Sequence, residues 1–493
     1  MKRARRSLLQ IMISNSNFGG DMWKFEDFGS NLSIIDENGI TISYSELKHI
    51  TDEITRHINK RCLVFSLCEN TVGSVVGYTS FINNRVVPVL LSASLDIELL
   101  DSLLSTYCPE YIWLPNSIRG RFPDATVQYS CYDYSLIKTD YANSFKLYDE
   151  LALLLTTSGS TGSPKLVRQS YNNVRSNAES IVEYLELNST ERPITTLPMN
   201  YTYGLSIINS HLMVGATLLV TSKGIMQKEF WQFFREQNAT SFGGVPYTYE
   251  MLDRLRFYRM KLPSLRYMTQ AGGKITETLH KKFAEYAKDN SKKFVVMYGQ
   301  CEATARMGYL PYDMAIEKCG SMGIAIPGGK FALIDSEGNI VEHSGITGEL
   351  IYEGENVTLG YAERGEDLAL GDERHGILHT GDMAKRDEDG FYYIVGRKKR
   401  FLKIFGNRVN LDEIDRLIKD KFDNTEVASS GIDDHMYIFV TNHEQSEDIR
   451  NFVIHMTKLN PTAFKIVVID EIPKNDSGKV LYRELAKYYE DAQ

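Results

Sequence analysis

The chain of 493 residues lacks several features that mark other classes of protein. No stretch approaches the roughly 18 consecutive apolar residues of a membrane-spanning helix. The net charge of -9 provides no general attraction for nucleic acid. Cysteines are few and no two of them form a C-x-x-C pair: Cys62, Cys68, Cys108, Cys131, Cys301 and Cys319. That spacing argues against a zinc site and against a disulfide framework, so we expect a reduced, cytoplasmic protein.

The N-terminal stretch MKRARRSLLQIMISNSNF resembles a secretory signal peptide in its basic start. Its apolar part, LLQIMI, is shorter than the roughly 7–15 apolar residues of a true signal peptide, and no small-residue cleavage site follows. We therefore expect a frayed, cytosolic N-terminus.

Short β-rich runs alternate with amphipathic helical patterns over most of the chain. RCLVFSL, VVPVLL, ALLLTT, PITTLPM and KFVVMYG are typical of buried strands, whereas NNVRSNAESIVEYL and MQKEFWQFFREQN are typical of helices. The alternation predicts an α/β fold with mostly parallel sheets in a large N-terminal domain of several subdomains. At this length two or more domains are expected.

The predicted secondary-structure pattern changes twice in the last third of the sequence. Beyond about residue 320, strands, glycines and turns predominate, as in GELIYEGENVTLGY, which predicts a small antiparallel subdomain. From about residue 400, the helical pattern LDEIDRLIKDKF and the strand patterns MYIFVT and FKIVVID predict a small α+β domain. We place the two domains at residues 1–398 and 399–493, joined at GRKKRFLK, whose like charges favour an exposed linker.

One loop directly follows the apolar run at 151–155. TTSGSTGSPK, residues 156–165, is rich in glycine, hydroxyl side chains and one lysine, and such a loop suits an anion. It is not a Walker loop, because G-x-x-x-x-G-K-[ST] needs a lysine directly after the second glycine, whereas Ser163 and Pro164 follow Gly162. In isolation the loop could equally be a solvated turn between two strands.

Four further segments follow the loop in order. YGQCEAT (298–304) comes directly after a buried strand, at the strand end where ligands collect in α/β sheets. HTGDMA (379–384) contains Asp382, a carboxylate that could accept both hydroxyls of a ribose. GRKKRFLKIFGNRV (396–409) and PKNDSGKVLYREL (473–485) complete the series. Each alone could be an ordinary turn or surface charge, but five such segments in this order are hard to attribute to chance.

The ordered set resembles the adenylate-forming superfamily of acyl-CoA synthetases, adenylation domains of peptide synthetases and luciferases. The resemblance covers residues 150–485 through specific motifs and the first 150 more loosely. Through LPMNYTYGLSIINSHL, TQAGGKI and MYGQCEATAR the chain is most similar to stand-alone bacterial AMP-dependent acid ligases of polysaccharide or secondary-metabolite clusters. The resemblance implies a mobile C-terminal domain and, as partners, a small carboxylic acid and an acyl carrier protein.

The resemblance also implies a role for individual residues, with ATP and Mg²⁺ as the ligands. The residues implied to hold the triphosphate are Thr157, Ser158, Gly159, Ser160, Thr161, Gly162 and Lys165. Those implied to flank the adenine are Gly272, Gly273 and Tyr298, and those implied to hold the ribose are Asp382 and Arg397. Glu302 would carry Mg²⁺ and act in catalysis with Lys479, the implied catalytic lysine. Lys399 would be the hinge, and Gly406 would belong to the face presented when the thioester forms.

Several residues depart from the superfamily pattern. Cys301 stands where a threonine usually precedes the glutamate, and Tyr201 replaces a histidine in the wall of the acyl pocket. Arg400 occupies a position that is usually acidic, which would alter the pairing of the linker. NYTYG lacks the aspartate that binds the ammonium of an amino-acid substrate, so an α-amino acid is disfavoured.

The resemblance implies ATP-dependent activation of a carboxylic acid to acyl-AMP with release of pyrophosphate. The acyl group would then pass to a thiol, either CoA or the phosphopantetheine of a carrier protein. Two alternatives stay open: a ligase that forms amides or activates amino acids, and a non-catalytic nucleotide-binding module. The sequence leaves the identity of the acid, the choice of thiol and the oligomeric state open.

Overall fold

The computed structural model describes most of the chain: residues 21–141, 145–156, 165–404, 407–423, 425–432, 434–457, 460–475 and 478–492. Within these ranges no helix has the length and apolar character needed to cross a bilayer. The expectations for the N-terminal stretch, for residues 157–164 and for Gly406 lie outside the described residues.

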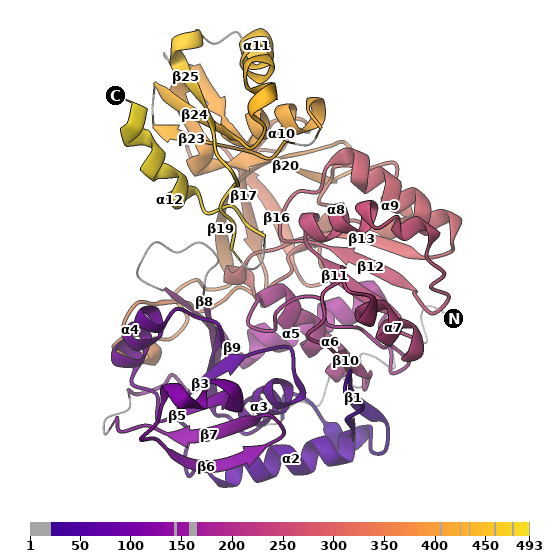
Figure 1. Cartoon of the computed structure of the whole chain (residues 1–493), viewed down its shortest axis with the longest axis vertical. Helices are drawn as coiled ribbons and strands as arrows, with labels where there is room; N and C mark the ends of the chain where they lie inside the picture. The colour runs from indigo at the N-terminus through magenta and orange to yellow at the C-terminus, as the bar shows by residue number, and fades with distance from the viewer. Residues whose placement is uncertain are drawn as a thin grey trace.

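The lower part of the molecule in Figure 1 is built on an eight-stranded sheet in the order β18-β9-β8-β4-β3-β5-β7-β6. Its strands are β3 (Leu63–Cys68), β4 (Val87–Ser92), β5 (Tyr111–Pro115), β6 (Thr126–Cys131), β7 (Tyr134–Lys138), β8 (Leu151–Thr156), β9 (Leu166–Ser170) and β18 (Gly360–Ala362). The central pairs β8–β4, β4–β3 and β3–β5 are parallel, whereas the outer pairs are antiparallel. The helices of this part are α2 (Tyr44–Arg56), α3 (Val72–Asn83), α4 (Ile97–Tyr107) and α5 (Tyr171–Leu185).

A second sheet, in the order β11-β12-β13-β14-β15, lies above α5 and α6 in Figure 1. Its strands are β11 (Ser241–Gly244), β12 (Tyr267–Gln270), β13 (Lys293–Tyr298), β14 (Gly308–Tyr309) and β15 (Ile324–Ala325). The first three strands are parallel. The helices around it are α6 (Thr202–Met213), α7 (Lys228–Glu236), α8 (Pro246–Arg254) and α9 (Glu277–Asp289). Side chains of α5 and α6 pack on one face of this sheet and those of α8 and α9 on the other, so the sheet is buried on both sides.

Two smaller sheets complete the part before residue 398. The three-stranded sheet consists of β1 (Leu32–Asp36), β2 (Thr41–Ser43) and β10 (Leu218–Val220). The four-stranded sheet consists of β16 (Lys330–Ile334), β17 (Thr347–Glu353), β19 (Ile377–Arg386) and β20 (Tyr392–Arg397). All pairs of the latter are antiparallel, so the predicted antiparallel region beyond residue 320 is confirmed.

The C-terminal part forms the top of the molecule in Figure 1. Its elements are β21 (Phe401–Ile404), β22 (Asn407–Asn410), α10 (Leu411–Lys421), β23 (Val427–Ile432), β24 (His435–Val440), α11 (Ser446–Thr457), β25 (Phe464–Val468) and α12 (Tyr482–Leu485). Strands β23 and β24 are antiparallel and β24 and β25 are parallel. Two hydrophobic clusters serve this part alone, and every buried member of them lies between Leu402 and Leu485.

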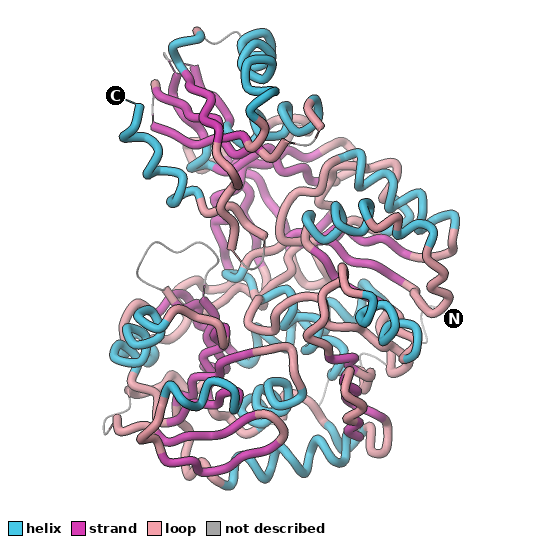
Figure 2. Tube along the Cα trace, viewed as in Figure 1, coloured by secondary structure: helices cyan, strands magenta, loops and turns pink. Residues whose placement is uncertain are grey.

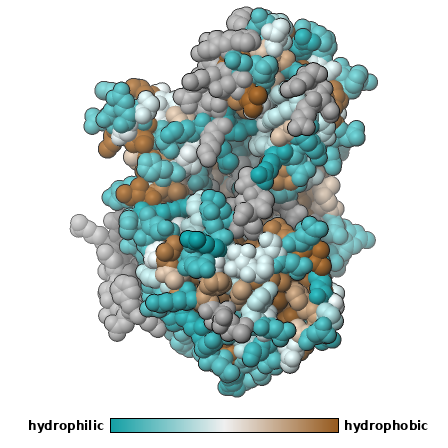
Figure 3. Space-filling view, turned by 90° about the vertical axis from the view of Figure 1, so that its left-hand side faces the viewer, coloured by the Kyte–Doolittle hydropathy of each residue, from teal (hydrophilic) through white to brown (hydrophobic). Residues whose placement is uncertain are grey.

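The predicted α/β class is confirmed: the central pairs of the eight-stranded sheet and the pairs β11–β12 and β12–β13 are parallel, and helices alternate with the strands (Figure 2). One strand prediction is wrong: in PITTLPM only Pro193 and Ile194 form single bridges. The two prolines of this segment have no N–H to donate, which prevents a continuous ladder. On the face seen in Figure 3 hydrophilic residues predominate and hydrophobic ones form small groups, in keeping with cores enclosed between the layers.

Candidate active site

Three loops follow the parallel strands β11, β12 and β13 at their carboxyl ends. The loop after β12 contains Gly272, whose φ of +84° favours glycine. A Cβ at Gly272 would lie 2.6 Å from the hydroxyl oxygen of Tyr201 and 3.0 Å from Cγ1 of Val245. Tyr201, which directly precedes α6, and Val245 of the loop after β11 therefore both lie against the loop after β12. The adjacent Gly273 accepts a hydrogen bond from the Gln270 side chain at its carbonyl, 2.9 Å away.

Asp382 is a buried carboxylate that is fixed by three partners. Tyr298 donates its hydroxyl to Oδ2 at 2.5 Å, and Gln300 donates Nε2 to the same oxygen at 2.9 Å. Arg397, the residue opposite on β20, places Nε 3.4 Å from Oδ1. Burial raises the pKa of Asp382, whereas the charge of Arg397 and the two donors act in the opposite direction. Tyr298 from the predicted adenine residues and both predicted ribose residues thus form one connected group.

Glu302 lies in the short turn after β13 and is oriented by Tyr361 of β18, whose hydroxyl donates to Oε1 at 2.7 Å. On the same tyrosine, the ammonium of Lys165 lies 5.3 Å from the ring centroid, and it forms an ion pair of 2.6 Å with Glu363. Arg374 lies 4.7 Å from the same ring centroid and donates to the carbonyl of Glu302 at 3.0 Å. Tyr361 therefore links the carboxylate to the lysine that ends the glycine-rich loop.

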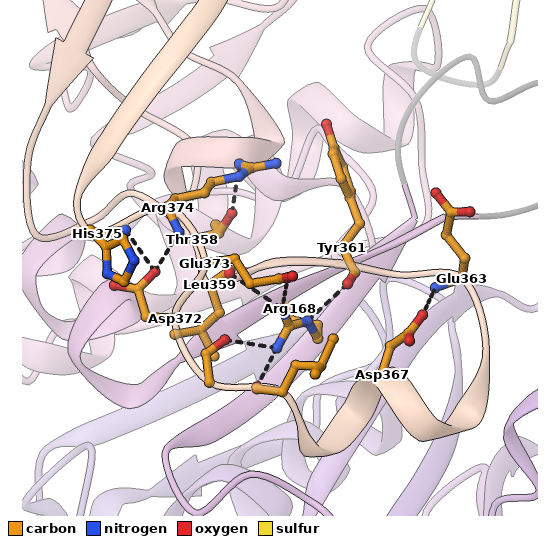
Figure 4. Close-up of polar contacts among 12 residues, drawn as sticks. Arg168, Thr358, Leu359, Tyr361, Glu363, Asp367, Asp372, Glu373, Arg374 and His375 are labelled. Atoms are coloured by element: carbon orange, nitrogen blue, oxygen red, sulfur yellow. Dashed lines mark hydrogen bonds and ion pairs between the residues drawn. The ribbon is translucent and has the colours of Figure 1, made fainter.

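Figure 4 shows the contacts that hold Tyr361 in place, and in it the side chain of Tyr361 points away from Arg168. The guanidinium of Arg168, a residue of the neighbouring strand β9, is paired with Glu373. It also donates to main-chain carbonyls of that region, including that of Tyr361 at 2.9 Å. Burial lowers the pKa of Arg168, and Glu373 counteracts that shift. This arrangement holds the backbone of β18 so that Tyr361 faces Glu302.

Lys479 comes from the C-terminal part and reaches this group from above. Its ammonium lies 5.6 Å from the ring centroid of Tyr201. Gly478 adopts a φ of +75°, and a Cβ there would lie 3.7 Å from Cβ of Tyr247, so the turn rests against the start of α8. Burial lowers the pKa of Lys479, and the charge of Glu302 acts to raise it.

The linker between the two parts is held more firmly than its charge predicts. Lys399 lies in the short 3-10 turn Lys398–Arg400 between β20 and β21. Arg400 donates to Asp412 at 2.8 Å and to Asp415 at 2.9 Å, and it lies 3.9 Å from the ring centroid of Tyr482. The prediction of an exposed linker is therefore wrong for Arg400, because two carboxylates and an aromatic face neutralise and cover its charge.

The structure brings together the described members of the predicted site at the junction of the sheets: Lys165, Tyr201, Gly272, Gly273, Tyr298, Glu302, Asp382, Arg397 and Lys479. Sequence reasoning missed Gln300, Tyr361 and Arg374. Gln300 lies within YGQCEAT and could have been included on that ground. Tyr361 and Arg374 lie far from Glu302 in sequence, and no local pattern indicates their contacts.

The arrangement can neutralise a polyanion. Two lysines and two arginines lie among three carboxylates, including the Glu363 that pairs with Lys165, at the ends of parallel strands where ligands bind in α/β sheets. Among the described residues no group of three or more His, Cys, Asp or Glu could hold a metal ion. Glu302 offers a single carboxylate, which fits Mg²⁺ because that ion takes one or two carboxylates, phosphate oxygens and water.

Comparison with known proteins gives a consistent result. The sequence profile of a family described as AMP-binding enzyme matches residues 115–362. The chain is 28% identical over 359 residues to an oxalate–CoA ligase of Arabidopsis thaliana, which covers 69% of this chain and 68% of that protein. It is 30% identical over 398 residues to a long-chain-fatty-acid–CoA ligase of Yersinia pestis, covering 76% of this chain and 66% of that protein. The chain thus spans about two thirds of the length of these relatives.

Solved structures show the same fold. ATP-bound MatB from Rhodopseudomonas palustris matches with a TM-score of 0.77 at 21% identity, over 96% of this chain and 99% of that one. o-Succinylbenzoate CoA synthetase from Bacillus subtilis, in complex with its acyl-adenylate intermediate, matches with a TM-score of 0.75 at 19% identity, over 92% and 95%. At these identities the likeness concerns the fold, which extends over nearly the whole chain.

Proposed function

The chain belongs to the AMP-binding enzyme family, and on that basis we propose that it is an AMP-forming acid–thiol ligase. It activates a carboxylic acid with ATP to acyl-AMP, releases pyrophosphate and transfers the acyl group to a thiol. The observation that carries the proposal is the position of Lys479. It reaches from the C-terminal part to Tyr201 and interacts electrostatically with Glu302. A purely nucleotide-binding module has no need of a cation delivered there by a separate part of the chain.

The residues match the electrostatic demand of the first half-reaction. A carboxylate oxygen of the acid attacks the α-phosphorus of ATP, the bond from that phosphorus to the bridging oxygen breaks, and pyrophosphate leaves. Two anions must approach each other, so positive charge is needed where negative charge develops. Lys479 would supply it at the α-phosphate and Lys165 at the outer phosphates. Asp382 would accept the ribose hydroxyls, held in place by Tyr298 and Gln300.

Glu302 is the residue that would hold Mg²⁺, since its carboxylate is fixed by Tyr361 beside Lys165. When bound, Mg²⁺ supplies further charge neutralisation on the phosphate oxygens. Tyr361 keeps one carboxylate oxygen occupied and so orients the other. Residues 157–164 would complete the triphosphate site.

The second half-reaction needs a different arrangement. The thiol sulfur attacks the carbonyl carbon of acyl-AMP and loses its proton, and the bond to the AMP oxygen breaks. We propose that domains 1–398 and 399–493 turn about Lys399, so that Lys479 leaves and the face with Gly406 approaches. The separate hydrophobic clusters of the C-terminal part support this division. So do the polar contacts across it, such as Arg416 to Glu277 at 3.7 Å.

The choice of acid and thiol is open within this proposal. The relatives named above act on acids with one carboxylate and on acids with two. The acceptor is CoA, as in the names of the relatives, or the phosphopantetheine arm of an acyl carrier protein. We place the reaction in the cytoplasm, because all six cysteines are free thiols.

Exchange of radiolabelled pyrophosphate into ATP across a panel of acids tests the proposal directly. We expect acid-dependent exchange, followed by thioester formation when CoA or a loaded carrier protein is added. Exchange without thioester formation would favour an amide-forming ligase. ATP binding without exchange for any acid would show a nucleotide-binding module.

A further inference from the structure

Two arginines of the described residues are fully buried, Arg168 and Arg306, with exposed fractions of 0% and 2%. Arg168 is paired with the carboxylate of Glu373, as Figure 4 shows. Arg306 forms no ion pair with an aspartate or glutamate anywhere in the described part of the chain. An arginine keeps its charge under all ordinary conditions, so Arg306 is a buried cation with no anion beside it.

The partners of Arg306 are all uncharged. Nε donates to Oγ of Ser206 at 3.1 Å, and Nη1 donates to the hydroxyl of Tyr184 at 2.9 Å. Nη1 also points to the sulfur of Met297 at 3.3 Å, a weak acceptor for a charged donor. The guanidinium carbon lies 5.3 Å from the ring centroid of Tyr203. None of the hydrogen bonds found among the described residues uses Nη2.

Such an arrangement is costly unless a ligand completes it. A buried charge without a counter-ion costs several kcal/mol, and neutral donors and acceptors recover only part of that. Arg168 and Arg400 show how this chain neutralises other covered arginines, with one and two carboxylates respectively. Departures from this pattern of pairing are expected at functional sites.

A chain of neighbouring side chains links Lys479 to Arg306. The ammonium of Lys479 lies 5.6 Å from the ring of Tyr201, and the rings of Tyr201 and Tyr203 are 6.3 Å apart. Tyr203 in turn carries Arg306 at 5.3 Å. The side chains of Tyr201 and Tyr203, at the start of α6, therefore lie between two cations. One is the ammonium of Lys479 and the other is the guanidinium of Arg306. An acid laid along the two rings would meet a positive charge at each end.

We propose that Arg306 binds a second carboxylate at the far end of the acid, so that the enzyme selects acids with two carboxylates. The proposal rests on the ligase function and names its substrate class. A guanidinium recognises a carboxylate through parallel N–H donors. The N–H groups of Nη2, which make none of the hydrogen bonds described above, would donate to the second carboxylate of the acid. Arg306 is a specificity-determining residue in this proposal, remote from the atoms that react.

The test compares three acids of equal chain length: a dicarboxylic acid, its monomethyl ester and the monocarboxylic acid. In pyrophosphate exchange we expect the wild type to prefer the diacid by about 100-fold in kcat/KM, since breaking a buried charged pair costs on this scale. Arg306→Met should lose that preference because KM for the diacid rises. Its exchange rate with the monoacid should be retained. A terminal phosphonate of the same length shows whether the site takes any anion or a carboxylate.

A matched control and a binding measurement make the outcomes distinct. Arg192 is another arginine held by uncharged groups, with Nε bonded to the carbonyl of Gln237 at 2.6 Å, so Arg192→Met should leave the acid preference unchanged. The diacid alone should raise the melting temperature of the wild type and of Arg192→Met, but not that of Arg306→Met. A wild-type preference for the monoacid, or an equal loss for all acids in Arg306→Met, would overturn the proposal. Diacid binding that depends on Arg306 without any exchange would overturn the ligase function alone.

Discussion

The ammonium of Lys479 lies 5.6 Å from the ring centroid of Tyr201, which joins the C-terminal turn to the residue directly before α6. Under the proposed function, the contact would place a cation where the acid and the α-phosphate of ATP meet. It also explains why burial lowers the pKa of Lys479, because the tyrosine excludes water from one side of the ammonium. In the mechanism proposed above, this is the arrangement that serves the first half-reaction.

Lys479→Ala should separate the two half-reactions. Loss of one preorganised donor at the α-phosphate should lower pyrophosphate exchange by about 10²–10³-fold. Thioester formation from supplied acyl-AMP should be largely retained, since that step develops no new charge at phosphorus. Lys474→Ala is the control, because Lys474 lies on the same turn but pairs with Glu426 at 2.7 Å. Equal losses in both assays would contradict the rotation of the C-terminal domain.

Glu302→Gln should weaken the use of Mg²⁺ and leave the fold intact. The amide keeps an acceptor for the Tyr361 hydroxyl but lacks the charge that a hard cation requires. We expect a sharp fall in pyrophosphate exchange and a higher Mg²⁺ concentration for half-maximal rate. The free energy of unfolding should stay unchanged to within about 0.5 kcal/mol. Glu317→Gln serves as a surface control. An unaltered Mg²⁺ dependence would remove Glu302 from the metal site.

Asp382→Asn should reduce activity without reducing stability. A carboxyl whose pKa is raised by burial binds more protons in the folded state, so its ionisation lowers stability as pH rises through the folded pKa. The amide removes that penalty. Loss of a charged acceptor for the ribose should lower kcat/KM for ATP by about 10–100-fold.

The same substitution has a signature in the pH profile. In the wild type, activity should fall on acidification at a higher pH than for an ordinary aspartate, and in Asp382→Asn this limb should disappear. Asp335→Asn, at an exposed turn whose backbone N–H groups lower the pKa of Asp335, should leave the limb in place. An acidic limb shared by wild type and Asp382→Asn would assign it to another group.

The parts of the site that sequence could predict are those with local signals. The turn YGQCEAT follows the buried strand β13, so Tyr298 and Glu302 could be placed at a strand end before the fold was known. The bond from Gln300 to Asp382 spans 82 residues and depends on how β13 and β19 meet. No periodicity or composition within either segment specifies that meeting.

The two errors of sequence reasoning have different physical causes. PITTLPM has the apolar, β-branched composition of a strand, but its prolines cannot donate to a ladder. The charge run around Arg400 is typical of an exposed linker, yet Asp412 and Asp415 on α10 neutralise that arginine. The first error overlooked a local property of the residues themselves, whereas the second depended on tertiary partners that the charge run does not reveal.

Arg400→Met should destabilise the C-terminal part by about 3–5 kcal/mol, because it leaves the buried carboxylate of Asp415 without its counter-ion. Burial already raises the pKa of Asp415 to about 6. Protonation removes the buried charge, so the loss of stability should be smaller at pH 5 than at pH 7.5. Urea unfolding followed by circular dichroism measures both values.

Two further variants identify the cause of that loss. Asp415→Asn in the Arg400→Met background should recover part of the stability, since it removes the unpaired charge. Arg416→Met, on the exposed side of the same helix with partners 3.7 and 3.9 Å away, should change stability by less than about 0.5 kcal/mol. A loss that is independent of pH would indicate missing packing against Tyr482 instead.

The last prediction concerns the contact between Gly272 and Tyr201. Gly272→Ala adds a Cβ 2.6 Å from the tyrosine hydroxyl at a φ of +84°, so it combines a steric clash with backbone strain of about 1–3 kcal/mol. Gly328→Ala separates the two effects, because Gly328 has a φ of +82° and open space around it. We expect Gly272→Ala to lower pyrophosphate exchange at least about tenfold and Gly328→Ala to affect stability alone. Tyr201→Phe removes the clashing oxygen, so the double variant Gly272→Ala, Tyr201→Phe should exchange faster than Gly272→Ala. A double variant no faster than the single one would mean that Tyr201 does not form the wall that positions the acid.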